Sequence, residues 1–146
     1  MKTKVGILYS LTHFSWFQYK KCGRTSQSIK KRISNMQTSL LGNIDIIYTT
    51  NTLIDCYFYE YLMKQILKNY RINTKKEMFF VDEFDIKMIF DFIDELNFKF
   101  NTEEKLNWYI QNYHLDYYKK RKYVKKDHLN EKKMKKKKVL FVDTTY

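Results

Sequence analysis

The feature that most restricts the fold is an alternation of short strand-like runs with longer segments of helical periodicity. Residues 5–11 (VGILYSL) and 44–49 (IDIIYT) are rich in apolar, β-branched and aromatic side chains, which is typical of strands. Residues 19–23 are a candidate antiparallel partner of the first run, joined to it by an aromatic loop at residues 13–17. Residues 78–81 are also apolar and fit either a strand or a buried turn. The pattern predicts an α+β fold.

Four segments have the apolar spacing of amphipathic helices, each preceded by a residue that can act as an N-cap. The second is expected to run from Leu53 to about Tyr70, and the fourth to about Tyr113. The candidate caps are Ser26 or Ser28, Asn51 or Thr52, Asp82 or Asp85, and Asn101, the last with Glu104 as in a capping box.

The charge of the chain is unevenly distributed. At 146 residues and 44% hydrophobic content, the sequence suits one compact domain with an appendage. Residues 119–138 contain 12 Lys or Arg and two acidic residues, a net charge of +10, whereas the rest of the chain carries only +2. Clustered positive charge favours a polyanionic partner, although AT-rich coding also produces Lys-rich sequences. This segment is expected to be either helical or disordered.

Cysteine spacing and hydropathy indicate a soluble intracellular protein, with cytoplasm and nucleus equally compatible. Cys22 and Cys56 are far apart in sequence and have no metal-binding spacing, so we expect reduced thiols and no disulfide-linked partner. The N-terminus has no apolar run long enough for a signal peptide or a membrane span, so no membrane partner is expected.

Four residues are candidates for chemistry from their positions in the expected helices and strands. Glu60 lies close to an apolar helix face, where a carboxylate needs a cation, a metal or water beside it. On periodicity alone, a structural ion pair or a solvated side chain is the favoured explanation of Glu60. Arg32 borders another apolar stripe and suits either phosphate binding or coverage of the stripe. Tyr9 and Lys21 occupy adjacent expected strands and can meet on one face.

Taken together, several short motifs resemble those of the GIY-YIG nuclease superfamily, and most closely its viral and phage branch, often described as DNA-binding. They are GILY at residues 6–9, KCGRT at 21–25, Arg32, Glu60 on the next long helix, and EMFF at 77–80. Their order and spacing agree over roughly residues 4–97.

The resemblance implies a small three-stranded antiparallel sheet flanked by helices, and metal-dependent hydrolysis of DNA phosphodiesters with Mg²⁺ or Mn²⁺. It divides the chain into a nuclease-like domain at residues 1–100, an additional helix at 101–118 and a Lys-rich basic tail at 119–146. The alternative is a catalytically inactive DNA-binding module with the same fold and tail. RNA is a further possible partner.

Residue roles follow from the same resemblance. Tyr9 matches the tyrosine of the first motif, Arg32 the arginine that contacts phosphate, and Glu60 the carboxylate that binds the metal, while Lys21 assists at the phenol or the phosphate. Tyr19, Gly23 and Glu77 are further candidates for the site. Nucleic-acid contacts are expected from Arg24, Lys119, Lys120, Arg121, Lys122, Lys135, Lys136, Lys137 and Lys138.

Some positions depart from the family pattern. Ile7 stands where the first motif has its glycine, Lys21 replaces the tyrosine two residues before Gly23, and Glu77 is only an approximate match for the late asparagine. These departures are what an inactive binding module would show.

Overall fold

The computed structural model describes residues 4–72 and 77–119. The chain divides into two compact units, Met1–Asn101 and Thr102–Tyr146. Strands β1 to β4 and helices α1 to α3 belong to the first unit, and α4 belongs to the second. Within the described ranges, no helix combines the length and the apolar character needed to cross a bilayer.

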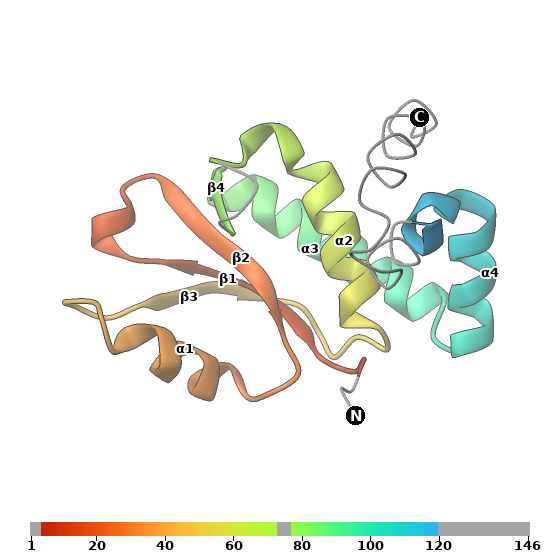
Figure 1. Ribbon diagram of the computed structural model, residues 1–146, viewed down its shortest axis with the longest axis horizontal. Helices are drawn as coiled ribbons and strands as arrows, with labels where there is room; N and C mark the ends of the chain where they lie inside the picture. The colour runs from red at the N-terminus through yellow and green to blue at the C-terminus, as the bar shows by residue number, and fades with distance from the viewer. Residues whose placement is uncertain (1–3, 73–76, 120–146) are drawn as a thin grey trace, which may run out of the picture. The chain divides into compact units, whose positions relative to one another are not determined.

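The first unit contains an antiparallel sheet in the order β3-β1-β2-β4 (Figure 1). Its strands are β1 (Ile7–Thr12), β2 (Tyr19–Thr25), β3 (Asp45–Thr49) and β4 (Met78–Phe80). The α+β class is confirmed, but the three-stranded expectation was wrong because the apolar run near residue 80 pairs with the outer edge of β2, Tyr19 opposite Phe80. This pairing satisfies backbone groups that would otherwise lie at an open sheet edge.

Two of the expected helix caps are confirmed. Helix α1 (Ile29–Gln37) has Ser28 as its N-cap, and the Ser28 hydroxyl accepts a hydrogen bond from the Lys31 N–H. Helix α3 (Glu83–Lys99) has Asp82 as its N-cap, and the Asp82 carboxylate accepts a hydrogen bond from the Asp85 N–H. In both cases the capping oxygen satisfies an amide that has no partner within the helix.

The other two caps were wrong. Helix α2 (Cys56–Ile66) is capped by Asp55 instead of Asn51 or Thr52, because the chain before it stays extended and forms a bridge between Gly6 and Leu53. A short 3₁₀ turn, η2 (Lys68–Tyr70), replaces its expected last turn. Helix α4 (Glu103–Tyr113) is capped by Thr102 rather than Asn101, and a helical turn at 115–119 follows it.

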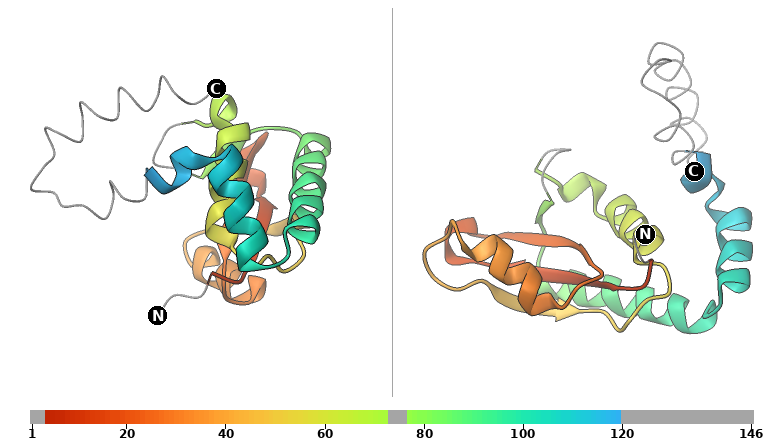
Figure 2. Two further views of the ribbon diagram at one scale, coloured as in Figure 1. Left: turned by 90° about the vertical axis from the view of Figure 1, so that its right-hand side faces the viewer. Right: turned by 60° about the horizontal axis from the view of Figure 1, so that its bottom comes forward.

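The sheet has a different helix on each of its two faces. Tyr9 and Leu11 are fully buried, and Ile29, Ile33 and Met36 of α1 pack against the cluster they form. Side chains alternate between faces along a strand, so Leu8 and Arg24 point to the other face, where α2 contacts β1 and β2. Helix α3 contacts β3 (Figure 2). Its Asp94 side chain also accepts a hydrogen bond at 2.9 Å from the N–H of Asn51, in the chain that follows β3.

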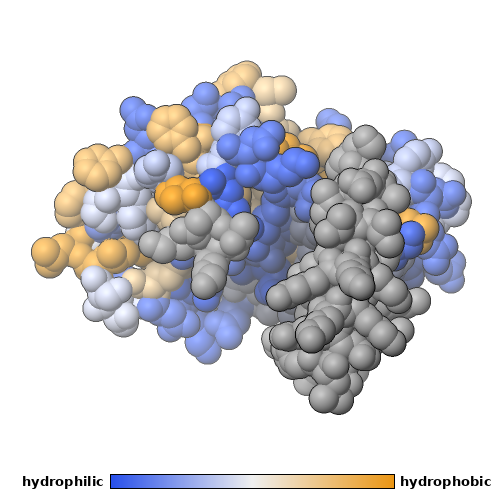
Figure 3. Space-filling view, turned by 45° about the horizontal axis from the view of Figure 1, so that its top comes forward, coloured by the Kyte–Doolittle hydropathy of each residue, from blue (hydrophilic) through white to orange (hydrophobic). Residues whose placement is uncertain are grey.

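The loop between β1 and β2 keeps apolar side chains in solvent. It contains the 3₁₀ turn η1 (Phe14–Trp16), and Phe14 and Phe17 are 72% and 84% exposed. Leu41, which precedes β3, is similarly exposed. Hydrophobic side chains are prominent in Figure 3 at the left edge of the view, the side on which Figure 1 draws this loop.

The two cysteines are free and buried. Burial, with a smaller contribution from the charge of Glu77, raises the pKa of the Cys22 thiol from 9.0 to about 12. The native state therefore keeps a proton that the unfolded chain releases above pH 9.0. The stability that this proton contributes is complete below that pH and is lost as pH rises towards the folded pKa.

We accordingly expect Cys22→Ala to flatten the alkaline loss of stability. The part of the slope of unfolding free energy against pH that this thiol contributes approaches about 1.4 kcal/mol per pH unit. Urea unfolding of both proteins, followed by far-UV circular dichroism at several values between about pH 8 and pH 11, measures it. Equal slopes for wild type and variant would contradict a protonated, buried thiol.

Candidate functional site

The candidate site is built around the missing side chain of Gly23. Residue pairing places Tyr9 of β1 directly opposite Gly23 of β2. A Cβ atom at Gly23 would lie 2.7 Å from the Tyr9 Oη and would also collide with Glu77 Oε2. The phenol and the carboxylate therefore face the same small space above the glycine, on the strand next to β4.

Arg32 reaches this space from α1. Its Nε donates to the Tyr9 Oη at 3.2 Å, so the guanidinium lies on the sheet-facing side of the helix. Burial raises the pKa of Tyr9, and the hydrogen bond from Arg32 partly offsets that rise. The same hydrogen bond raises the pKa of Arg32. At neutral pH the pair is thus a neutral phenol held by a guanidinium cation, an arrangement better suited to orienting a water or a phosphate than to removing a proton.

Glu60 projects from α2 and is held by two cations. Its Oε1 lies 3.2 Å from Arg24 Nε and 3.6 Å from Lys64 Nζ, with the Glu60 side chain 13% exposed. The Arg24 guanidinium also stacks on the Tyr57 ring, 3.8 Å from its centroid. The cation expected beside this carboxylate is present, and the structural ion pair considered from the sequence is formed.

Lys64 connects Glu60 to Glu77. Its Nζ lies 3.9 Å from Glu77 Oε1, while the main-chain carbonyl of Glu77 accepts from the Cys22 N–H at 3.0 Å. The other carboxylate oxygen, Oε2, is buried with no hydrogen-bond partner among the described residues. Sequence reasoning did not single out Lys64; its signal was the i, i+4 spacing from Glu60.

Two other candidates lie farther along the sheet. Lys21 pairs with Leu11 and Met78, which puts it on the same face as Tyr9 but away from Gly23. Tyr19 is four residues before Gly23, roughly 13 Å along the strand, and its ring packs edge-on against Phe80. Tyr19 is therefore not brought to the cluster.

Few of the expected nucleic-acid contacts can be placed. Arg24 points to the α2 face of the sheet and is paired with Glu60, and Lys119 ends the described part of the chain. The other expected contacts, Lys120, Arg121, Lys122, Lys135, Lys136, Lys137 and Lys138, lie outside the described residues.

The donor set at Glu60 and Glu77 is compatible with Mg²⁺ or Mn²⁺. Among the described residues, no three His, Cys, Asp or Glu side chains gather as a complete metal-binding group. Mg²⁺ is commonly held by one or two carboxylates together with water and substrate phosphate. Two carboxylates that share Lys64, one of them with an unsatisfied buried oxygen, meet that requirement.

Comparison of the chain with family models, with curated proteins and with solved structures found no match. The GIY-YIG resemblance is therefore carried by its short motifs, and the proposed roles of the clustered residues are argued from their positions.

Proposed function

We propose that the chain is a metal-dependent endonuclease that hydrolyses or nicks DNA. The observation that carries the proposal is the set of contacts around Gly23, where a phenol, an arginine and the Glu77 carboxylate meet. Lys64 links Glu77 to the second carboxylate, that of Glu60. Arginine suits a phosphate oxygen, and carboxylates suit a divalent cation. Together they can stabilise the negative charge that develops during phosphodiester hydrolysis.

Each residue of the candidate site has a role that follows from its chemistry. Glu60 and Glu77 would hold the divalent ion, which when bound polarises the phosphate and stabilises developing negative charge. Arg32 contacts a phosphate oxygen and offsets charge in the transition state. Tyr9, kept protonated by burial, uses its hydroxyl to orient the attacking water. Lys21, on the same sheet face as Tyr9, offers a second cation for the DNA backbone.

A non-cleaving DNA-binding module is the second candidate, and one observation favours it. Glu60 already forms ion pairs with Arg24 and Lys64, so a metal ion would have to compete with two cations for this carboxylate. In the binding module these contacts only stabilise the fold, and the basic tail supplies the affinity.

The deciding test is nicking of supercoiled plasmid by the full chain with Mg²⁺, Mn²⁺ or EDTA. We expect open-circular product with either ion and none with EDTA. A chain truncated after Tyr118 should bind DNA more weakly and with a smaller salt dependence, because it lacks the whole +10 segment. DNA binding without nicking under any of these conditions would establish the binding module instead.

A further inference from the structure

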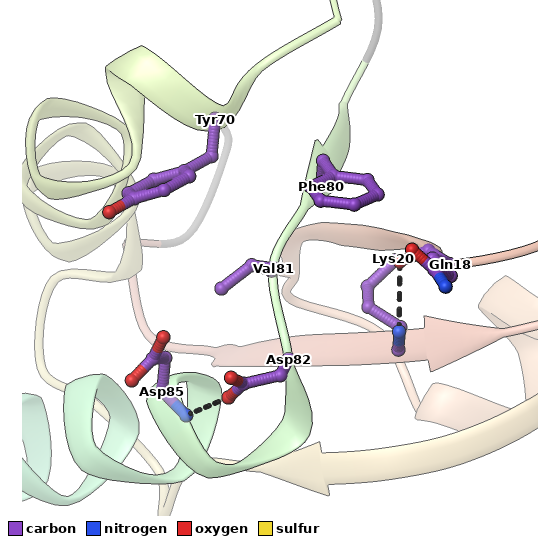
Figure 4. A pocket seen from close by; sticks show the side chains of 7 residues that line it. All are labelled: Gln18, Lys20, Tyr70, Phe80, Val81, Asp82 and Asp85. Atoms are coloured by element: carbon purple, nitrogen blue, oxygen red, sulfur yellow. Dashed lines mark hydrogen bonds between the residues drawn. The ribbon is translucent and has the colours of Figure 1, made fainter.

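A polar and aromatic cavity, separate from the cluster around Gly23, lies at the end of β4. Its volume is about 430 Å³, within the usual range for small-molecule sites. Figure 4 shows Tyr70 and Asp85 on one side of Val81, with Lys20 and Gln18 on the other. The cavity is completed by Phe80 and Asp82. None of these residues belongs to the cluster around Gly23.

The lining combines two exposed rings with charges of both signs. Tyr70 and Phe80 are each 51% exposed, although Phe80 already packs edge-on against Tyr19. The Lys20 ammonium donates to the Gln18 carbonyl at 3.0 Å and keeps further N–H groups for a ligand. The cavity can therefore contact a flat ring and an anion at once.

Its two carboxylates have different roles. Asp82 is the N-cap of α3 and accepts from the Asp85 N–H at 2.8 Å, so this helix terminus already has its acceptor. The Asp85 carboxylate has neither a hydrogen bond nor an ion pair within the described ranges, and Asp85 is exposed. Asp85 thus has both carboxylate oxygens available to accept from a ligand's N–H group.

We propose that this cavity binds one unpaired nucleotide whose base carries an exocyclic amino group, an inference that rests on the proposed action on DNA. Phe80 and Tyr70 offer faces for base stacking, Asp85 accepts from the amino group, and Lys20 contacts a phosphate. A simple organic cation would use the rings and the carboxylates but would be repelled by Lys20. A nucleotide uses all three features.

The position of the cavity suits a single DNA substrate spanning both sites. Phe80 follows Glu77 by three residues, roughly 10 Å along an extended chain. That length corresponds to roughly three base-pair steps of a duplex. The inferred substrate is therefore a duplex with an unpaired cytosine, adenine or guanine a few nucleotides from the scissile phosphate. Thymine is disfavoured because it has no exocyclic amino group and presents a carbonyl oxygen to Asp85.

The test is a fluorescence-anisotropy titration of the full chain with three duplexes, in EDTA so that none is cleaved. One is fully paired, and the others carry one extrahelical cytosine or thymine. We expect the cytosine bulge to bind about tenfold more tightly than the paired duplex and several-fold more tightly than the thymine bulge. Phe80→Leu should remove the preference for a bulge, and Asp85→Asn should equalise cytosine and thymine.

Phe92→Leu is the matched control, because Phe92 is a similarly exposed phenylalanine on α3 outside the cavity. Equal binding of all three duplexes by wild type, or a bulge preference that survives Phe80→Leu, would overturn the inference while leaving the endonuclease proposal intact. Absence of binding to any DNA would overturn both. A bulge preference in a protein that never nicks DNA would support the cavity and refute cleavage.

Discussion

Glu60→Gln is expected to reduce Mg²⁺-dependent nicking by about 100-fold or more while leaving DNA binding nearly unchanged. Glutamine has the shape of glutamate but lacks the charge that a divalent ion requires. The glutamine side chain fills the same space beside Arg24, whose Nε lies 3.2 Å from Oε1 in the wild type, so the packing of α2 against β2 should survive. Nicking rates and duplex affinity, measured on the same preparations, separate the two effects.

The control is Glu95→Gln, at an exposed position of helix α3, which removes the same charge away from the cluster. Thermal melting of each variant checks that Glu60→Gln remains folded, because it also weakens two partly exposed ion pairs. Should Glu60→Gln nick plasmid at the wild-type rate, Glu60 would be a structural partner of Arg24 and Lys64 with no part in metal binding.

The parts of the fold that were predicted correctly are those with local signals. Ser28 and Asp82 are caps followed by apolar residues at helical spacing, and both act as expected. The cap of α2 was missed because its position depends on a distant contact. The bridge between Gly6 and Leu53 keeps the chain extended as far as Asp55, so the two earlier candidates cannot begin the helix.

The candidate site was only partly predictable for the same reason. The motifs indicated Tyr9 and Arg32, but only the packing of α1 on the sheet shows that they share a hydrogen bond. The position of Glu77 depends on β4, a three-residue strand that sequence alone did not distinguish from a turn. Lys64 was not singled out from the sequence, and only the folded chain places it between two carboxylates.

Gly23→Ala should both destabilise the first unit and suppress nicking. The added Cβ would lie 2.7 Å from the Tyr9 Oη and 3.1 Å from its Cζ, and Tyr9 is fully buried and has little room to move. Overpacking of this kind costs about 1–3 kcal/mol, which lowers Tm by roughly 5–20 °C in a domain of this size. Displacement of the phenol and of Glu77 should reduce nicking at least about tenfold.

A double-mutant cycle with Tyr9→Phe tests whether this cost arises at the phenol. Removing the hydroxyl removes the nearest Tyr9 atom, so Gly23→Ala should be clearly less destabilising in the Tyr9→Phe background. Gly42→Ala is the matched control, because Gly42 has φ +81° and lies beside Phe14, so its cost does not involve Tyr9. Chemical denaturation gives the four free energies of each cycle. If Tyr9→Phe leaves the cost of Gly23→Ala unchanged, the phenol does not occupy the space above this glycine.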